Sequence, residues 1–403
     1  MATATKTLHG LPENVIFCKK CLISNQRPST QREFKKSDTI IDTVGFGDDG
    51  ICDTCKWFEY KNTQISWDKR EKELEELCDR FRRNDGRYDV IVPASGGKDS
   101  IYVAHLLKEK YGMHPLTVTW APHMYTDIGW KNFNHMIEAG LDNIKVTPNG
   151  KVHRLLTRLA FENLVNPFQP FIIGQKNVAP RAALQYDVPL IMYGENQAEA
   201  HNHFSENLSP LMDISHFSTK TATEDMYFGG VHVNDLKKDY GITDNDLFLY
   251  KPLLEDEIRA KNVEVHFFSY YVNWSPQENY YYVKENTGFE SNPDGRSEGT
   301  YTKFASLDDK IDGQHYYTMY IKFGQGRAMN DANRDIRDGF ITREEGVDLM
   351  NKYDGEFPKK YFQEVLDYMG ITEERYWEVI DKARSPHLWE KVGGEWKLKH
   401  PTK

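Results

Sequence analysis

Short apolar runs alternate with amphipathic stretches between residues 67 and 260. The runs are rich in β-branched and other apolar residues, which is typical of strands buried on both faces of a parallel sheet. The stretches between them repeat apolar residues at helical spacing. The pattern therefore predicts an α/β fold with a doubly wound, mostly parallel sheet. The expected strands are Tyr88–Ala94, Pro115–Trp120, Asn143–Val146 and Val188–Tyr193, and the expected helices include residues 101–107, 130–139, 152–164 and 168–186.

The pattern also divides the rest of the chain. An amphipathic helix is expected at residues 67–83, and an apolar stripe through Leu349 and Val365 predicts a helical tail at residues 341–400. We expect four segments: a flexible tail at 1–16, a small cysteine-containing knuckle at 17–66, the α/β domain at 67–260, and a C-terminal substrate-pocket and helical region at 261–403.

A glycine turn follows the first predicted strand and begins the first predicted helix. Gly96 and Gly97 have no Cβ, so the backbone there can approach an anion closely and direct several N–H groups at it. The neighbouring side chains add hydroxyl and ammonium donors. The spacing is not that of a Walker A loop. We interpret the turn as a phosphate cradle, formed by Ser95, Gly96, Gly97, Lys98, Asp99 and Ser100.

Polar and aromatic residues also follow two other predicted strands. In doubly wound sheets, ligands bind beyond the carboxyl ends of the strands. Trp120 is therefore a candidate contact for adenosine, and His123 is either functional or an ordinary loop histidine. Gly194 and Glu195 follow the strand at Val188–Tyr193, and Glu195, with Asp99, is a candidate ligand for Mg²⁺. Glu199 and His201 are weaker candidates at the same turn.

Four of the five cysteines form two Cys-x-x-Cys pairs, and they are Cys18, Cys21, Cys52 and Cys55. Two such pairs can present four thiolates tetrahedrally, as a structural Zn²⁺ prefers. An iron–sulfur cluster, a sulfur-relay role and unligated buried thiols are the alternatives. Cys78 lies within a helical repeat and is interpreted as a core residue.

The composition limits the class of partner and the compartment. The net charge of −10 and the pI of about 5.8 argue against a nucleic-acid backbone as the main partner. The chain begins without a basic-then-apolar signal and has no apolar run long enough to cross a bilayer. Paired cysteines rather than a disulfide framework favour a reducing compartment. We expect a cytoplasmic protein with no nucleic-acid and no membrane partner.

Aromatic and cationic residues mark the C-terminal half. The tyrosine-rich run at residues 270–282 contains Trp274 and is suited either to a sugar ring or to an ordinary interface. Lys322 and Arg327 beside glycine turns indicate an anionic group nearby. Arg334 and Arg337 are interpreted either as part of that site or as partners of the neighbouring aspartates in a solvated network.

The hexapeptide Ser95–Ser100 resembles the PP-loop of the ATP pyrophosphatases, Ser-Gly-Gly-x-Asp-Ser, at every fixed position. These enzymes cleave ATP between the α- and β-phosphates and activate a substrate oxygen as an adenylate. The resemblance implies that ATP and Mg²⁺ are used and that Ser95, Lys98 and Asp99 are catalytic. Glu255 stands where the family often has a lysine, so Lys251, Lys303 or Lys322 would have to supply that charge.

A more specific resemblance covers residues 17–360. The paired cysteines, the Tyr-Gly-Glu-Asn turn at 193–196, and the segments 274–280 and 321–327 are similar to those of N-acetyl sugar amidotransferases of bacterial surface-polysaccharide synthesis. This implies conversion of an acetamido to an acetamidino group with ATP and ammonia, on a nucleotide-linked or sialic-acid-like sugar. It places Trp274, Lys322 and Arg327 near that sugar.

The resemblance also implies partners. We find no cysteine nucleophile typical of a glutaminase, so a separate glutaminase subunit would supply ammonia, with a cyclase-like subunit as its channel. Two alternatives stay open: a tRNA-modifying PP-loop enzyme, and a nucleotide-sensing scaffold without catalysis.

Overall fold

The computed structural model describes residues 7–29, 40–195, 203–220 and 225–402. Its central sheet has five strands in the order β3-β2-β1-β4-β9, and every neighbouring pair is parallel. The first four strands lie where the sequence predicts them. The fifth, β9, lies beyond the predicted domain boundary at residue 260, so the α/β domain extends further. The strands are β1 (Val90–Pro93), β2 (Pro115–Trp120), β3 (Asp142–Val146), β4 (Leu190–Tyr193) and β9 (Glu264–Phe267).

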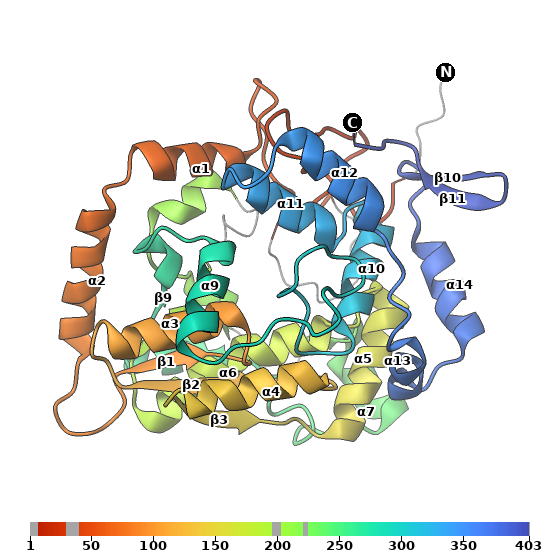
Figure 1. Ribbon diagram of the computed structural model, residues 1–403. Coiled ribbons are helices and arrows are strands. Elements are labelled where there is room, and N and C mark those ends of the chain that lie inside the picture. The colour runs from red at the N-terminus through yellow and green to blue at the C-terminus, as the bar shows by residue number, and fades with distance from the viewer. Residues whose placement is uncertain (1–6, 30–39, 196–202, 221–224, 403) are drawn as a thin grey trace.

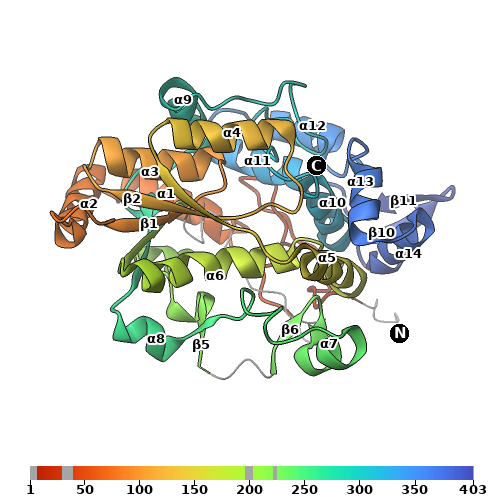
Figure 2. The same cartoon turned by 90° about the horizontal axis from the view of Figure 1, so that it is seen from below.

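Helices cover both faces of this sheet, as Figure 2 shows with α4 above it and α6 below it. Because side chains alternate along a strand, β1 sends Val90 and Val92 into one core and Ile91 into the other. The doubly wound architecture is thus present. The helices between these strands are α3 (Lys98–Glu109) after β1, α4 (Asp127–Glu138) after β2, and α5 (Gly150–Leu164) and α6 (Gln169–Tyr186) between β3 and β4.

The N-terminal region packs on the rest of the molecule from residue 8 onward. The Leu8 amide donates to Ser385 Oγ at 2.9 Å, His9 Nε2 lies 2.7 Å from the Ala383 carbonyl, and Leu11 is buried. This differs from the flexible tail predicted for residues 1–16. Two helices lead into the sheet, α1 (Asp53–Thr63) and α2 (Trp67–Phe81).

The insertion between β4 and β9 holds short elements. They are the 3₁₀ turns Phe204–Leu208 and Ile214–His216, β5 (Ser218–Thr219), β6 (Tyr227–Phe228), β7 (Val231–His232), α7 (Val233–Tyr240), β8 (Leu253–Leu254) and α8 (Glu255–Ala260), with a third 3₁₀ turn, Phe268–Tyr270, after β9.

The C-terminal region is mainly helical, as predicted, but it ends in a hairpin. A two-residue Gly393-Gly394 turn, with φ of +63° and +89°, joins the last two strands. That dipeptide is a strong hairpin signal, so the helical prediction is wrong there. The elements are α9 (Pro276–Asn286), α10 (Asp312–Phe323), α11 (Arg327–Arg337), α12 (Arg343–Tyr353), α13 (Phe362–Met369), α14 (Glu373–Ala383), β10 (Trp389–Val392) and β11 (Glu395–Leu398).

Figure 1 shows α11 and α12 in blue above the region of β1 and α3. No helix in the described ranges is long and apolar enough to cross a membrane.

Candidate active site

The loop from β1 into α3 has the predicted strand–turn–helix form. Gly96 has a φ of +93°, and a Cβ added there would lie 2.7 Å from Cα of Phe133 on α4. A side chain is therefore excluded by both conformation and space. Gly97 is the N-cap of α3, and no side chain caps that helix end. Its free amides and positive end are available to an anion.

Lys98 and Asp99 form an ion pair at the start of α3. Lys98 Nζ lies 2.6 Å from Asp99 Oδ2, and Asn279 Nδ2 on α9 donates to Asp99 Oδ1 at 3.0 Å. Burial lowers the pKa of Lys98. Burial acts to raise the pKa of Asp99, but Lys98 and the hydrogen bond from Asn279 lower it overall. The carboxylate is thus held charged in a fixed orientation.

The charged face of α11 lies opposite this loop. Arg327, Asp331 and Arg334 fall at positions i, i+4 and i+7, which share one helix face. Arg327 Nε lies 3.0 Å from Asp331 Oδ1. Arg334 Nη2 lies 2.5 Å from Oε1 of Glu195, just after β4. Burial acts to lower the pKa of Arg334, but Glu195, Asp331 and Asp99 raise it overall.

The two interpretations concerned Arg334 and Arg337. Arg334 pairs with Glu195 in a half-buried network beside Asp99, whereas Arg337 lies by the cysteine cluster. Glu195 and Asp99, the predicted Mg²⁺ ligands, are each engaged by a cation, so neither presents the free hard-oxygen site that Mg²⁺ needs.

Two aspartates complete the cluster: Asp308 in the segment before α10, and Asp312, the first residue of α10. Asp308 hydrogen-bonds to Ser95, and burial together with Asp309 raises its pKa. Burial raises the pKa of Asp312 to about 7, opposed by Arg327 and reinforced by Asp308. A carboxyl group that titrates near neutral pH beside an anion cradle is equipped to accept or donate a proton.

The four cysteines of the two pairs converge in a buried cluster, with all four Sγ atoms within 4.8 Å of one another. Sγ atoms lie 3.9 Å apart for Cys18 and Cys55, and 3.8 Å apart for Cys21 and Cys52. A tetrahedron of Zn–S bonds of about 2.3 Å has edges of about 3.8 Å. The donor set therefore fits Zn²⁺. Cys78 is buried in the core apart from this cluster, as predicted.

The cysteine cluster is joined directly to α11. The Leu22 amide, next to Cys21, donates to Asn333 Oδ1 at 2.7 Å, and the Leu22 side chain packs among Met329, Ala332 and Met350. Burial acts to lower the pKa of Arg337, but the thiolates of Cys21, Cys55 and Cys52 raise it overall. The knuckle thus packs against the helix that carries Arg327 and Arg334.

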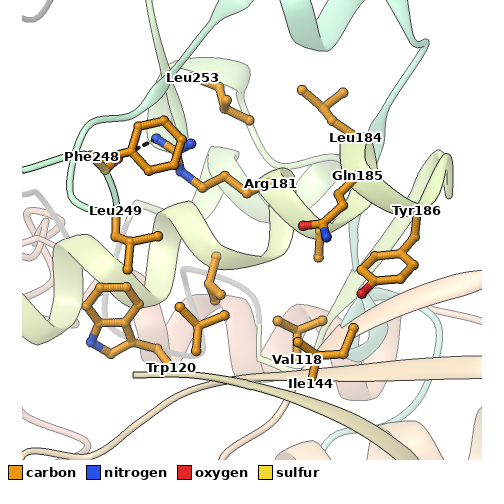
Figure 3. Close-up of a pocket in the computed structure, with 13 residues that line it drawn as sticks. Val118, Trp120, Ile144, Arg181, Leu184, Gln185, Tyr186, Phe248, Leu249 and Leu253 are labelled. Carbon is orange, nitrogen blue, oxygen red and sulfur yellow. Dashed lines mark hydrogen bonds between the residues drawn. The ribbon is translucent and has the colours of Figure 1, made fainter. Parts of the chain in front are cut away.

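Trp120 lies away from the loop. It is buried on the α6 face of the sheet, where its ring packs over Gly174 and lies 5.5 Å from the ring of Tyr250. It lines an apolar cavity of about 380 Å³ with Val118 and Arg181 (Figure 3). Its predicted contact with adenosine finds no support in this placement.

Several other predicted site residues contact only other parts of the protein in the described structure, and their contacts are those of core or ion-paired residues. Trp274 is buried in the core beneath Gly194, and Lys322 is buried and donates to the Leu164 carbonyl at 2.8 Å at the end of α5. Lys251 pairs with Asp244 at 2.6 Å.

Some predictions concern residues at the margin of the cluster. His123 is fixed by Asp309, with 2.7 Å between Nδ1 and Oδ2. Lys303 is exposed. Glu199 and His201 lie outside the described residues. Of the predicted set, the structure brings together Ser95–Ser100, Glu195 and Arg327.

Sequence reasoning missed Asn279, Asp308 and Asp312. Asn279 lies within the segment whose similarity was noted, so that similarity was a signal. The two aspartates carry no motif, and only the packing of the segment before α10 against Gly129 of α4 shows their position.

The fold and site together define a parallel α/β protein with a glycine-containing strand-to-helix loop faced by a helix that carries Arg327 and Arg334. Residues 298–402, which include α10–α14, match the family described as "LPS biosynthesis protein WbpG-like, C-terminal domain". Uncharacterized protein MJ1599 of Methanocaldococcus jannaschii is 42% identical over 53 residues, 13% of this chain and 19% of that protein. The matched stretch thus spans about a fifth of that relative.

Among solved structures, one match is "Structure of NMN synthetase from Francisella tularensis", at 15% identity and a TM-score of 0.28, covering 49% of this chain and 94% of that one. This likeness is too low to bear on fold or function. The chain is therefore similar, over its C-terminal quarter, to a lipopolysaccharide-biosynthesis domain.

Proposed function

We propose that this protein is an ATP-dependent N-acetyl sugar amidotransferase of bacterial surface-glycan synthesis. The observation that carries the proposal is the position of α11. Its arginines face the Ser95–Ser100 loop, and α11 belongs to the segment that matches the lipopolysaccharide-biosynthesis family. An ATP-activating loop and a glycan-related segment thus contribute to one site.

In this reaction the acetamido oxygen attacks the α-phosphorus of ATP, and pyrophosphate leaves. Ammonia then adds to the activated carbon, a proton is lost, and AMP leaves with the original oxygen. The loop amides and Lys98 hold the phosphates, and Arg334 neutralises charge that develops on them. Asp312 is suited to take the proton from the added ammonia.

The test is formation of AMP and pyrophosphate from ATP with three acceptors, each with and without ammonium chloride. The acceptors are UDP-N-acetylglucosamine, N-acetylneuraminic acid and bulk tRNA. Stimulation by an N-acetyl sugar, with an amidine product one mass unit lighter than the acetamide, supports the proposal. Stimulation by tRNA alone, or no AMP under any condition, contradicts it.

We also propose that ammonia reaches the site from a separate glutaminase, through a cyclase-like subunit. The isolated chain should then use ammonium salts well and glutamine poorly. Equal turnover with glutamine alone would contradict this part. A Lys98→Ala variant is the control for contaminating glutaminase or ATPase, because it should lose both activities.

A further inference from the structure

Arg27 is a partly buried cation without a carboxylate partner among the described residues. It follows the first cysteine pair, and its backbone is fixed: its amide donates to the Ser24 carbonyl at 3.2 Å, and its carbonyl accepts from Val44 at 3.0 Å. Its Nη1 lies 4.0 Å from Sδ of Met319 on α10. A thioether is a weak acceptor, so the guanidinium retains most of its capacity to donate.

Arg327 approaches the same face of α10 from the opposite side. Its Nη1 donates to the hydroxyl of Tyr316 at 2.5 Å. Tyr316 and Met319 are three residues apart, and such side chains are neighbours on a helix, about 5–6 Å apart at Cβ. The guanidinium groups of Arg27 and Arg327 therefore contact α10 one turn apart.

The nearby acids compensate Arg327 but leave Arg27 without a paired carboxylate among the described residues. Asp331 is taken by Arg327 and by Thr300, whose hydroxyl donates at 2.8 Å. Asp354 accepts from the backbone amides of Gly326 and Met329 at 2.8 and 3.2 Å.

The pKa values of Arg27 and His315 agree with an unpaired positive charge on Arg27. Burial, together with Arg334 and Arg327, lowers the pKa of Arg27 to about 10, although Tyr316 and Asp354 act to raise it. Burial and Arg27 lower the pKa of His315 to about 3, so this histidine is neutral. Its Nδ1 is buried and has no hydrogen-bond partner in the part of the chain that the structure describes. A buried, unmatched cation is costly unless an anion pairs with it.

We propose that Arg27 and Arg327, with Tyr316 and His315, form a second anion site that binds the carboxylate or phosphate of the acceptor sugar. It is separate from the Ser95–Ser100 loop, which holds the triphosphate. Two guanidinium groups suit an anion with several acceptor oxygens. The inference rests on the proposed function and adds to it which residues hold the anionic group of the acceptor.

The experiment is calorimetric titration without ATP of the full chain with three probes. They are N-acetylneuraminic acid, which carries a carboxylate, UDP-N-acetylglucosamine, which carries a diphosphate, and neutral N-acetylglucosamine. We expect at least one anionic probe to bind tenfold or more tightly than the neutral one, and its identity names the anionic group. Arg27→Gln should raise that Kd at least tenfold, and Arg27→Lys less.

Arg87→Gln is the matched control, because Arg87 is exposed and precedes β1 at the opposite end of the sheet from the loop. It should leave every Kd unchanged. Failure of both anionic probes to bind more tightly than N-acetylglucosamine, or an unchanged Kd in Arg27→Gln, would overturn the proposal. The melting temperature separates binding from folding: removal of an unpaired cation should leave it unchanged or raise it, whereas a large fall would assign Arg27 a structural role.

The two proposals fail in different ways. If the anionic probe binds through Arg27 but no sugar stimulates AMP formation, the anion site stands and the amidotransferase proposal fails. If neutral N-acetylglucosamine supports AMP formation as well as the anionic probes do, the amidotransferase proposal stands and the anion site fails.

Discussion

Arg334 on α11 forms an ion pair with Glu195, the second residue after β4, although 139 residues separate them in the sequence. The pair joins the C-terminal helices to the edge of the sheet where the loop lies. Because both side chains are partly buried, it is less screened than a surface pair.

A double-mutant cycle tests this pair. Arg334→Gln and Glu195→Gln should each lower kcat/KM for pyrophosphate release by about ten- to a hundredfold, since each leaves its partner's charge uncompensated. The kcat/KM of the double variant should be no lower than that of the less active single variant, because the two residues act together. Arg375→Gln, at an exposed pair with Glu162, is the control and should retain activity. Strictly additive losses would show that the two residues act independently.

The close approach of Gly96 to α4 predicts a large effect of one methyl group. Gly96→Ala places a Cβ 2.7 Å from Phe133 Cα at a φ of +93°. We expect the free energy of unfolding to fall by more than about 1 kcal/mol, with loss of ATP binding. Gly150→Ala, which meets nothing within 4 Å at the start of α5, should be neutral or slightly stabilising. Urea denaturation compares the two, and equal effects would contradict the argument.

Because the cysteine knuckle packs on α11, loss of its metal should lower the stability of the protein. Cys52→Ser should reduce bound zinc well below one equivalent and lower the melting temperature, because the metal stabilises the fold that presents Leu22 to Asn333. Elemental analysis and thermal denaturation measure both effects. Cys78→Ser is the control, and it should keep its zinc even if it is less stable, since Cys78 lies outside the cluster. Full metal content in Cys52→Ser would contradict the assignment.

Asp312 should impose a pH dependence on stability. Burial raises its pKa to about 7, so the folded protein keeps a proton that the unfolded chain loses near about pH 4. Between these values the folded state binds more protons, and this group's contribution to the free energy of unfolding falls as pH rises.

Asp312→Asn removes that titration. Its melting temperature relative to the parent should therefore increase by about 2 °C or more between about pH 5 and 8. A constant difference over this range would show that Asp312 does not titrate there. Asp381→Asn, at an exposed position, is the control: the difference between its melting temperature and that of the parent should stay the same over this pH range.

Local pattern determined the sheet and the loop of this protein. The strands at 90–93 and 115–120 consist of apolar and β-branched residues, and Gly96 and Gly97 interrupt the pattern where the first strand turns into a helix. The two cysteine pairs likewise predicted the cluster in the knuckle, because four thiolates are enough to complete a tetrahedral metal site.

Tertiary structure alone decided what faces the loop. Asn279, Asp308 and Arg334 lie far from one another in the sequence and have no common motif, so only the packing of distant segments brings them to one place. Tertiary structure also places two predicted site residues away from the loop. Trp120 packs over Gly174 on the α6 face of the sheet, and Lys322 donates to the Leu164 carbonyl at the end of α5. A residue's type and spacing fix its local conformation, but its partners depend on contacts between distant segments.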